Sequence, residues 1–138
     1  MTIINMQTMR YINLLDRVSH VKTNRCFVYN NIIIFAVPRM MMPQALGQNL
    51  SNIREIQGQL GKRVRIIEEA RGIESVKKFI QDIVYPAKFK SLEIRDNELA
   101  ITAGGKQNKA ILLGRDKARL AELEQIVKDN FGLDLRII

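Results

Sequence analysis

Apolar and polar positions alternate with two periods along the first part of the chain. Residues 4–18 have apolar side chains at helical spacing, which predicts an amphipathic helix. Residues 21–29 and 32–37 are rich in β-branched and aromatic side chains and predict two strands. Asn30 and Asn31 separate the strands and suit the left-handed backbone of a tight turn. We therefore expect a helix followed by a β-hairpin, whose unbroken apolar second strand lies inside the sheet.

Two helices and a strand are expected after the hairpin. A short helix is predicted to run to Leu46 and to stop at Gly47. A second helix begins with Ser51 or Asn52 as its N-cap, and it ends at Gly61 before a strand at residues 64–67. The predicted order is helix, strand, strand, helix, helix, strand.

The second part of the chain predicts the same order. The first element is a helix, closed by Pro86, whose apolar stripe is Val76, Phe79, Ile80 and Ile83. Strands at residues 89–94 and 98–102 follow, and then a short helix to Leu113. The last elements are a strand at residues 133–137 and, before it, a long helix whose apolar stripe is Leu120, Leu123, Val127 and Phe131.

Short stretches of sequence also recur. Residues 60–67 read LGKRVRII and return as FGLDLRII at 131–138, and residues 28–34 have a fainter echo at 94–100. A spacing of 66 to 71 positions indicates a tandem duplication. We expect an α+β protein of two domains, residues 1–70 and 71–138. Domains of this size bury small cores, so we expect them to pack as a rigid pair.

The chain is basic, with 22 Lys and Arg against 14 Asp and Glu. The net charge is +5 over residues 1–70 and +3 over residues 71–138. Basic surfaces on both halves indicate a polyanionic partner, foremost nucleic acid, because cationic side chains displace the counterions of phosphates. Charge alone leaves a merely soluble basic protein equally open.

Other function classes find no support in the sequence. Cys26 is the one cysteine and His20 the one histidine, too few soft ligands for a transition metal, and Cys26 is expected in the core. Gly104, Gly105 and Lys106 do not complete a nucleotide phosphate loop. We expect no catalytic residues, no metal and no cofactor. The first six residues carry no targeting pattern, which favours a soluble cytoplasmic protein without a membrane partner.

In each half a short helix ends in glycine and a second helix starts a few residues later. The free N–H groups of such a helix start suit a phosphate, and an adjoining aliphatic groove could hold bases. The candidate RNA-binding residues are Gly47, Gln48, Asn49, Leu50, Ser51 and Asn52 in the first loop, Gly114, Arg115, Asp116, Lys117 and Arg119 in the second, and the flanking Lys62, Arg63, Lys106 and Lys109. Taken singly, both glycines could be ordinary helix C-caps, and the basic residues a solvated helix face.

This arrangement resembles the type II KH domain, whose Gly-x-x-Gly loop clamps single-stranded nucleic acid. Residues 86–94 look like the entry to the last KH domain of the NusA family, and residues 47–64 are similar to a NusA KH core. The resemblance covers roughly residues 20–138 and implies an archaeal NusA-like protein of two KH domains alone. It departs from the family pattern at the fourth loop position, which is Leu50 in one loop and Lys117 in the other. Leu50 should obstruct the approach of a phosphate, whereas Lys117 could replace the lost backbone contact with a point charge. We therefore expect weaker RNA binding than two intact loops would give.

The resemblance implies a non-enzymatic factor of transcription elongation or termination. Its expected partners are single-stranded RNA and RNA polymerase, and we expect it to be a monomer. The alternative is a protein-interaction module, in which the same grooves dock onto RNA polymerase or a ribosomal partner and RNA binding is weakened or lost. The altered loops favour this alternative.

Overall fold

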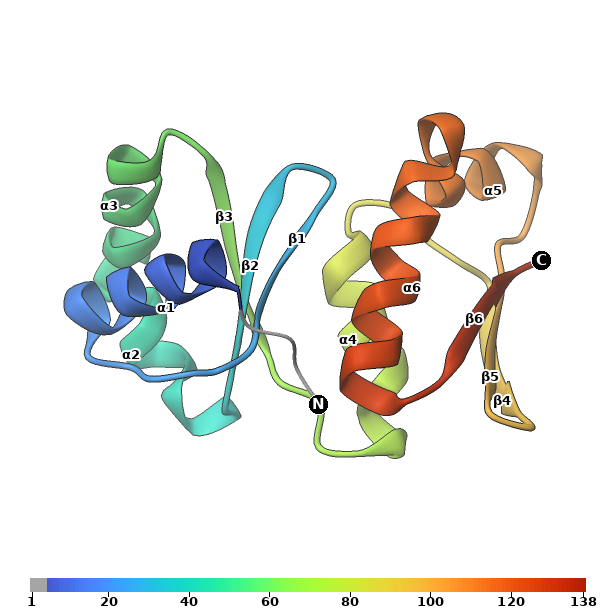
Figure 1. The fold of residues 1–138 in the computed structure, drawn as a ribbon, viewed down its shortest axis with the longest axis horizontal. Helices are drawn as coiled ribbons and strands as arrows, with labels where there is room; N and C mark the ends of the chain where they lie inside the picture. Colours follow the sequence, from blue (N-terminus) through green and yellow to red (C-terminus); the bar gives the residue numbers. More distant parts are fainter. Residues whose placement is uncertain (1–4) are drawn as a thin grey trace. The chain divides into compact units, whose positions relative to one another are not determined.

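The computed structural model describes residues 5–138, which divide into two compact units. The first unit contains the described residues up to Ala70, and the second contains Arg71–Ile138. Each unit has three α-helices and a three-stranded sheet, in the order helix, strand, strand, helix, helix, strand (Figure 1). The predicted α+β class is confirmed. None of the helices in residues 5–138 is long and apolar enough to cross a membrane.

The first unit has a mixed sheet in the order β1-β2-β3. Its elements are α1 (Met6–Ser19), β1 (Cys26–Tyr29), β2 (Ile32–Val37), α2 (Met42–Leu46), α3 (Ser51–Leu60) and β3 (Arg63–Glu68). Strand β2 pairs antiparallel with β1 and parallel with β3. All six β2 residues are buried, which agrees with the interior strand predicted from its unbroken apolar run.

Local side-chain chemistry fixes the start of α1. Asn5 caps the helix by accepting a hydrogen bond from the backbone N–H of Thr8, and the Thr8 hydroxyl accepts one from the backbone N–H of Asn5. The predicted helix began at residue 4, which lies outside the described residues. Leu15, Phe35 and Ile56 are fully buried and join helix α1, the sheet and helix α3 in one core.

The second unit repeats this topology. Its elements are α4 (Val76–Val84), β4 (Ser91–Arg95), β5 (Glu98–Thr102), α5 (Lys106–Leu113), α6 (Ala118–Phe131) and β6 (Asp134–Ile137). The sheet order is β4-β5-β6, with an antiparallel and then a parallel pair. The predicted stripe of α4 is buried, and the Phe79 ring packs edge to face against Phe131 with ring centroids 5.7 Å apart. Edge-to-face pairs of this kind add to the stability gained from burial.

Both hairpins turn through two residues with positive φ. These are Asn30 and Asn31 (φ 51° and 62°) in the first unit and Asp96 and Asn97 (φ 50° and 64°) in the second. Two successive left-handed residues match the twist of the flanking strands, and Asn and Asp tolerate that conformation best among side-chain-bearing residues. The predicted turn is confirmed at Asn30–Asn31.

Two predicted strands begin two or more residues later than expected. The first begins at Cys26 instead of residue 21, because the Thr23 hydroxyl donates to the carbonyl of Ala36 (2.6 Å) and accepts from the N–H of Arg25 (3.1 Å). A side chain thus takes the place of a backbone donor there. The other strand begins at Ser91 instead of residue 89, after residues that turn at the end of α4. In both cases a single apolar residue in the loop, Val21 or Phe89, mimics an extension of the strand.

Candidate nucleic-acid interface

The two loops between the short and long helices share one backbone conformation. Gly47 (φ 75°, ψ 171°) follows α2, and Gly114 (φ 74°, ψ 173°) follows α5. Each glycine opens a short 3₁₀ turn, Gln48–Leu50 in the first loop and Arg115–Lys117 in the second. In both, the N–H of the fourth loop residue donates to the glycine carbonyl, at 3.3 Å in the first loop and 3.1 Å in the second.

The third and fourth loop positions are left-handed in both loops. Asn49 (φ 56°, ψ 35°) matches Asp116 (φ 54°, ψ 29°), and Leu50 (φ 61°, ψ 27°) matches Lys117 (φ 60°, ψ 27°). The fourth position therefore keeps a backbone that glycine adopts readily, although neither loop has glycine there. The departure from Gly-x-x-Gly changes the side chain and leaves the conformation intact.

Positions 47 and 114 need glycine for two reasons: a Cβ would clash with neighbouring atoms, and the backbone φ is positive. A Cβ on Gly47 would lie 2.7 Å from Ser51 Oγ and 2.8 Å from Asn52 Cγ. A Cβ on Gly114 would lie 2.7 Å from Arg119 Cγ and 2.9 Å from the Arg119 backbone nitrogen. The start of the long helix thus packs directly on each glycine. An ordinary C-cap needs only the positive φ, so these glycines also set how closely the two helices approach.

The long helices begin without side-chain caps, although the sequence predicted one for α3. Leu50 and not Ser51 or Asn52 is the N-cap of α3, and Lys117 is the N-cap of α6. Neither helix start has a side-chain cap hydrogen bond. The N–H of the first residue of each helix, Ser51 or Ala118, donates to the carbonyl of Gln48 or Arg115 in the preceding 3₁₀ turn. The N–H groups that follow have no partner within the helix, so they can bind an anion or water.

Two predicted RNA-binding residues form equivalent contacts inside the protein. The Asn52 amide donates to the carbonyl of Gln44 (3.0 Å), and Nη1 of Arg119 donates to the carbonyl of Ile111 (3.1 Å). Both bonds join the fifth residue after the loop glycine to the third residue before it. They connect the long helix to the last turn of the short one. Asn52 and the stem of Arg119 thus help to position their loops.

The remaining loop candidates lie on the surface. Gln48, Asn49 and Ser51 are exposed in the first loop, and the side chain of Leu50 is 50% exposed. Arg115, Asp116 and Lys117 are exposed in the second loop. The second loop carries two cations and one carboxylate within three residues, whereas the first carries none. The second loop is therefore the better placed of the two to attract a phosphate.

The structure does not bring all predicted cations to the loops. Lys62 and Arg63 follow the C-terminal end of α3, so the ten residues of that helix, roughly 15 Å, separate them from the first loop. Lys106 begins α5, and Lys109 lies one turn closer to Gly114. The prediction that Lys62 and Arg63 surround the first loop is wrong, because a helix carries the chain away from the loop.

Arg54 is a cation near the first loop that the sequence reasoning missed. It is exposed, one turn into α3, and its Nη1 donates to the carbonyl of Asn49. The signal was its spacing, because a long side chain in the second turn of a helix can reach back over the N-terminal loop. Arg54 gives the first loop a positive charge that its own residues lack.

Strands β3 and β6 lie beside the helix pairs. Each is the edge strand of its sheet, with one neighbour, and each contacts the short and the long helix of its unit. In the second unit a hollow of about 420 Å³ lies between α6 and β6, with Lys128 Nζ 3.4 Å from Asp134 Oδ1 at its rim. Glu124 also lines this hollow, so its charge does not favour a phosphate. A base fits this environment better than the nucleic-acid backbone does.

Cys26 lies apart from this surface, buried in β1. Burial raises the pKa of the Cys26 thiol to about 12, so the thiol stays protonated and unreactive at neutral pH. Residues 5–138 contain no group of three or more His, Cys, Asp or Glu side chains placed to hold a metal ion.

The fold and the repeated loops define an α+β protein of two units with the same topology, each with one exposed helix–loop–helix surface. A search against family models finds no match. The chain is similar to a protein from Halococcus morrhuae described as "Probable transcription termination protein NusA", with 22% identity over 91% of this chain and 90% of that protein. This distant similarity supports a NusA-like relationship.

A solved structure shares the fold. It is described as "Crystal structure of APE1850", and it matches 98% of this chain and 100% of its own, with a TM-score of 0.66 and 20% identity. The arrangement of elements in this chain therefore recurs in a known structure.

Proposed function

We propose that this protein is a non-enzymatic factor of transcription elongation or termination that binds single-stranded RNA. In this proposal residues 1–70 and 71–138 are two type II KH domains acting in the cytoplasm. Each contacts RNA through its degenerate Gly-x-x-Gly loop and the groove beside it. The similarity to a protein described as a probable transcription termination protein supports the transcriptional role.

One observation carries the proposal, namely the identical backbone of the two loops. Their dihedral angles at the first, third and fourth positions differ by at most 6°, the value for ψ at Asn49 (35°) and Asp116 (29°). The residues at these positions differ everywhere except at the glycine. A shared conformation despite changed side chains indicates that the backbone itself has a role, and backbone N–H groups are what a KH loop presents to a phosphate.

The element order and sheet topology agree with the type II form of the KH domain. In this interpretation the phosphate lies at the start of the long helix, where the N–H groups have no side-chain cap. Bases occupy the groove between that helix and the edge strand, and free backbone groups of β3 and β6 read base edges. Binding of one strand by both loops would add avidity to two weak sites.

The test is a fluorescence-anisotropy titration of short single-stranded RNAs and matched DNAs over a salt series. We expect binding that prefers RNA and weakens as salt rises, because each phosphate contact releases counterions. Absence of RNA binding at low salt would contradict the proposal.

The second loop supplies the sharpest variant. Arg115→Glu combined with Lys117→Glu reverses two exposed charges beside Gly114, and we expect it to reduce RNA affinity roughly tenfold or more. Arg119 is left unchanged because its contact with Ile111 also holds the helices together. The matched control is Lys77→Glu with Lys88→Glu, two exposed residues of the same unit that belong neither to the loop nor to the helices that it joins. Equal losses in both variants would show a non-specific charge effect.

A protein-interaction module is the second candidate function. The observation in its favour is Leu50, whose apolar side chain is half exposed at the position where a KH loop has glycine. A large apolar side chain there suits contact with a protein such as RNA polymerase or a ribosomal partner better than contact with a phosphate. If this function holds, RNA binding is absent both before and after charge reversal at the second loop.

A further inference from the structure

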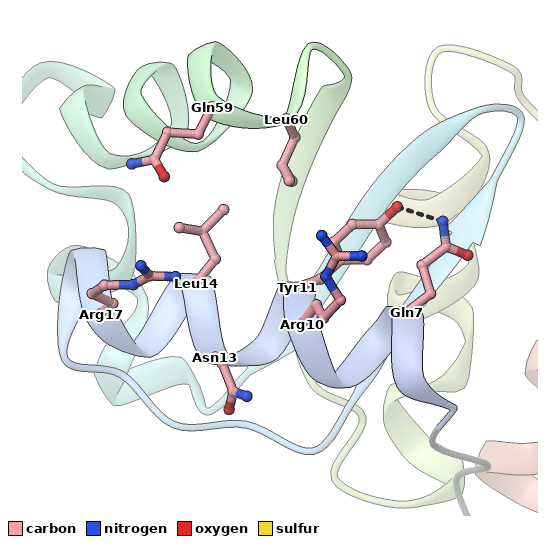
Figure 2. A pocket seen from close by; sticks show the side chains of 8 residues that line it. All are labelled: Gln7, Arg10, Tyr11, Asn13, Leu14, Arg17, Gln59 and Leu60. Atoms are coloured by element: carbon pink, nitrogen blue, oxygen red, sulfur yellow. Dashed lines mark hydrogen bonds between the residues drawn. The ribbon is translucent and has the colours of Figure 1, made fainter.

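We propose that a hollow between α1 and α3 of the first unit binds an acidic peptide segment that carries one large apolar side chain. The hollow measures about 450 Å³, within the roughly 300–1,000 Å³ of ligand sites. We call it the α1–α3 pocket. Tyr11, Leu14 and Leu60 form its apolar part, and Arg10, Arg17 and Gln59 are among its polar residues (Figure 2). The proposal does not depend on RNA binding by the loops.

The polar residues of the pocket select an anion. Two guanidinium groups, Arg10 and Arg17, come from α1, and the other polar groups are the carboxamides of Gln7, Asn13 and Gln59 and the Tyr11 hydroxyl. The described residues that line the pocket include no carboxylate. Nor does any described carboxylate form an ion pair with Arg10 or Arg17. Guanidinium groups bind carboxylates in a bidentate geometry, so acidic side chains are fitting partners.

The floor of the pocket is apolar. Leu14 extends from α1 toward α3, and Leu60 extends from the end of α3 toward α1 (Figure 2). Beside them Tyr11 is 6% exposed, and its hydroxyl accepts a hydrogen bond from the Gln7 amide at 2.9 Å. A partner with only charged groups would leave this floor in contact with water. A central apolar side chain flanked by carboxylates would satisfy both parts of the pocket.

In the second unit an aromatic side chain occupies the place that corresponds to the α1–α3 pocket. Leu60 and Phe131 are equivalent, because each is the last residue of its long helix before a C-cap glycine. Leu14 matches Phe79, because each is buried five residues before the end of the first helix of its unit, and that helix ends seven residues before the first strand in both units. Phe131 packs against Phe79 at 5.7 Å, whereas Leu60 is smaller than Phe131. The repeat thus provides a side chain from the protein itself that should fill the pocket.

Exposed methionines beside the pocket favour a protein partner over a nucleic acid. Met6 and Met9 precede Arg10 on α1, and they are 82% and 51% exposed. Flexible thioether side chains adapt to varied apolar surfaces, which is why they occur at peptide-binding faces. A phosphate backbone would gain nothing from them. Together with the apolar floor, they assign the site to a peptide.

The pocket is separate from the candidate RNA surface of the same unit. Gln59 and Leu60 end α3, whereas the loop at Gly47–Leu50 precedes its start. The ten residues of the helix place the two sites roughly 15 Å apart along its axis. An acidic peptide and RNA can therefore bind the first unit together.

The experiment uses the full chain and a fluorescein-labelled peptide of about ten Asp and Glu residues around a single Phe. We expect salt-dependent binding, with NMR shifts confined to α1 and the end of α3. Arg10→Glu with Arg17→Glu should weaken it roughly tenfold or more, because both exposed cations are replaced by repelling charges. Lys77→Glu with Lys88→Glu, which changes the net charge equally, should leave peptide binding within about twofold.

Leu60→Phe tests the apolar part without any change of charge. It places in the first unit the side chain that Phe131 supplies in the second, and it should weaken peptide binding roughly tenfold while the fold is retained. The same peptide with Ala in place of Phe should bind wild type as weakly. Binding unaffected by Leu60→Phe, no shifts at α1 with the peptide, or displacement of the peptide by single-stranded RNA would each overturn the proposal.

Discussion

Leu50 and Lys117 have a left-handed backbone conformation, which glycine adopts at little cost but a residue with a side chain does not. Their φ values are 61° and 60°, and the left-handed region costs an ordinary residue roughly 1–2 kcal/mol. Leu50 is half exposed, so it regains only part of this cost through burial. The loops therefore retain strain at the fourth position of the proposed phosphate clamp.

Leu50→Gly should be about 1 kcal/mol more stable than Leu50→Ala, because both variants lose the buried half of the leucine side chain and only glycine removes the strain. Urea denaturation measures the difference. Equal stability of the two variants would show that strain at Leu50 is not the cause. Under the proposed function, Leu50→Gly should also strengthen RNA binding.

Cys26 predicts a dependence of stability on alkaline pH. Burial raises the pKa of its thiol from 9.0 to about 12, so the folded state keeps the proton that the unfolded state loses. The free energy of unfolding should therefore be unaffected by Cys26 below pH about 9 and should fall as pH rises from there toward 12. Cys26→Ala, compared with wild type over this range, isolates the effect. Fast labelling of native protein by a thiol reagent at pH about 8 would contradict the burial argument.

At the scale of elements, each loop glycine sets the approach of two helices. Gly47→Ala should destabilise the protein by about 1–3 kcal/mol, because its Cβ would meet Ser51 and Asn52 and because its φ is +75°. Thermal or urea denaturation measures this loss. Gly58→Ala is the control within α3, where a Cβ meets nothing within 4 Å. That substitution should stabilise the protein by about 0.5–1 kcal/mol, and a loss in both variants would refute the steric account.

The sequence predicted elements well where periodicity decides them. The stripe of α4 and the strand Ile32–Val37 follow from the placement of apolar residues alone. The caps of α3 were mispredicted, because capping propensity is local and Asn52 instead bonds a carbonyl eight residues earlier. The α1–α3 pocket had no signal in the sequence. It depends on which helices pack together and on Leu60 being small at their contact.

At the scale of the whole molecule, each of the two units has buried positions that match those of the other. Ile56 in α3 and Leu123 in α6 are both fully buried and occupy equivalent places in the repeat. Each substitution to Ala should cost about 2–5 kcal/mol by creating a cavity. Hydrogen exchange resolved by residue measures where that cost falls. We expect Ile56→Ala to raise exchange rates chiefly within residues 5–70, and Leu123→Ala chiefly within residues 71–138.

That expectation follows from the division of the chain into two compact units. If either substitution accelerated exchange equally throughout the chain, the units would unfold as one cooperative body. The proposed domain boundary at residue 70 would then divide two topological repeats but not two units that unfold independently.

The matching backbone dihedral angles of the two loops also affect how this protein could evolve. Because Gly47–Leu50 and Gly114–Lys117 trace the same path, the four residues of one loop can be transplanted into the other with little need to rebuild the surrounding unit. Each copy is then free to acquire its own ligand chemistry while its twin preserves the original. The repeated loop thus provides a ready template for divergence, with an apolar tip in one unit and a charged tip in the other.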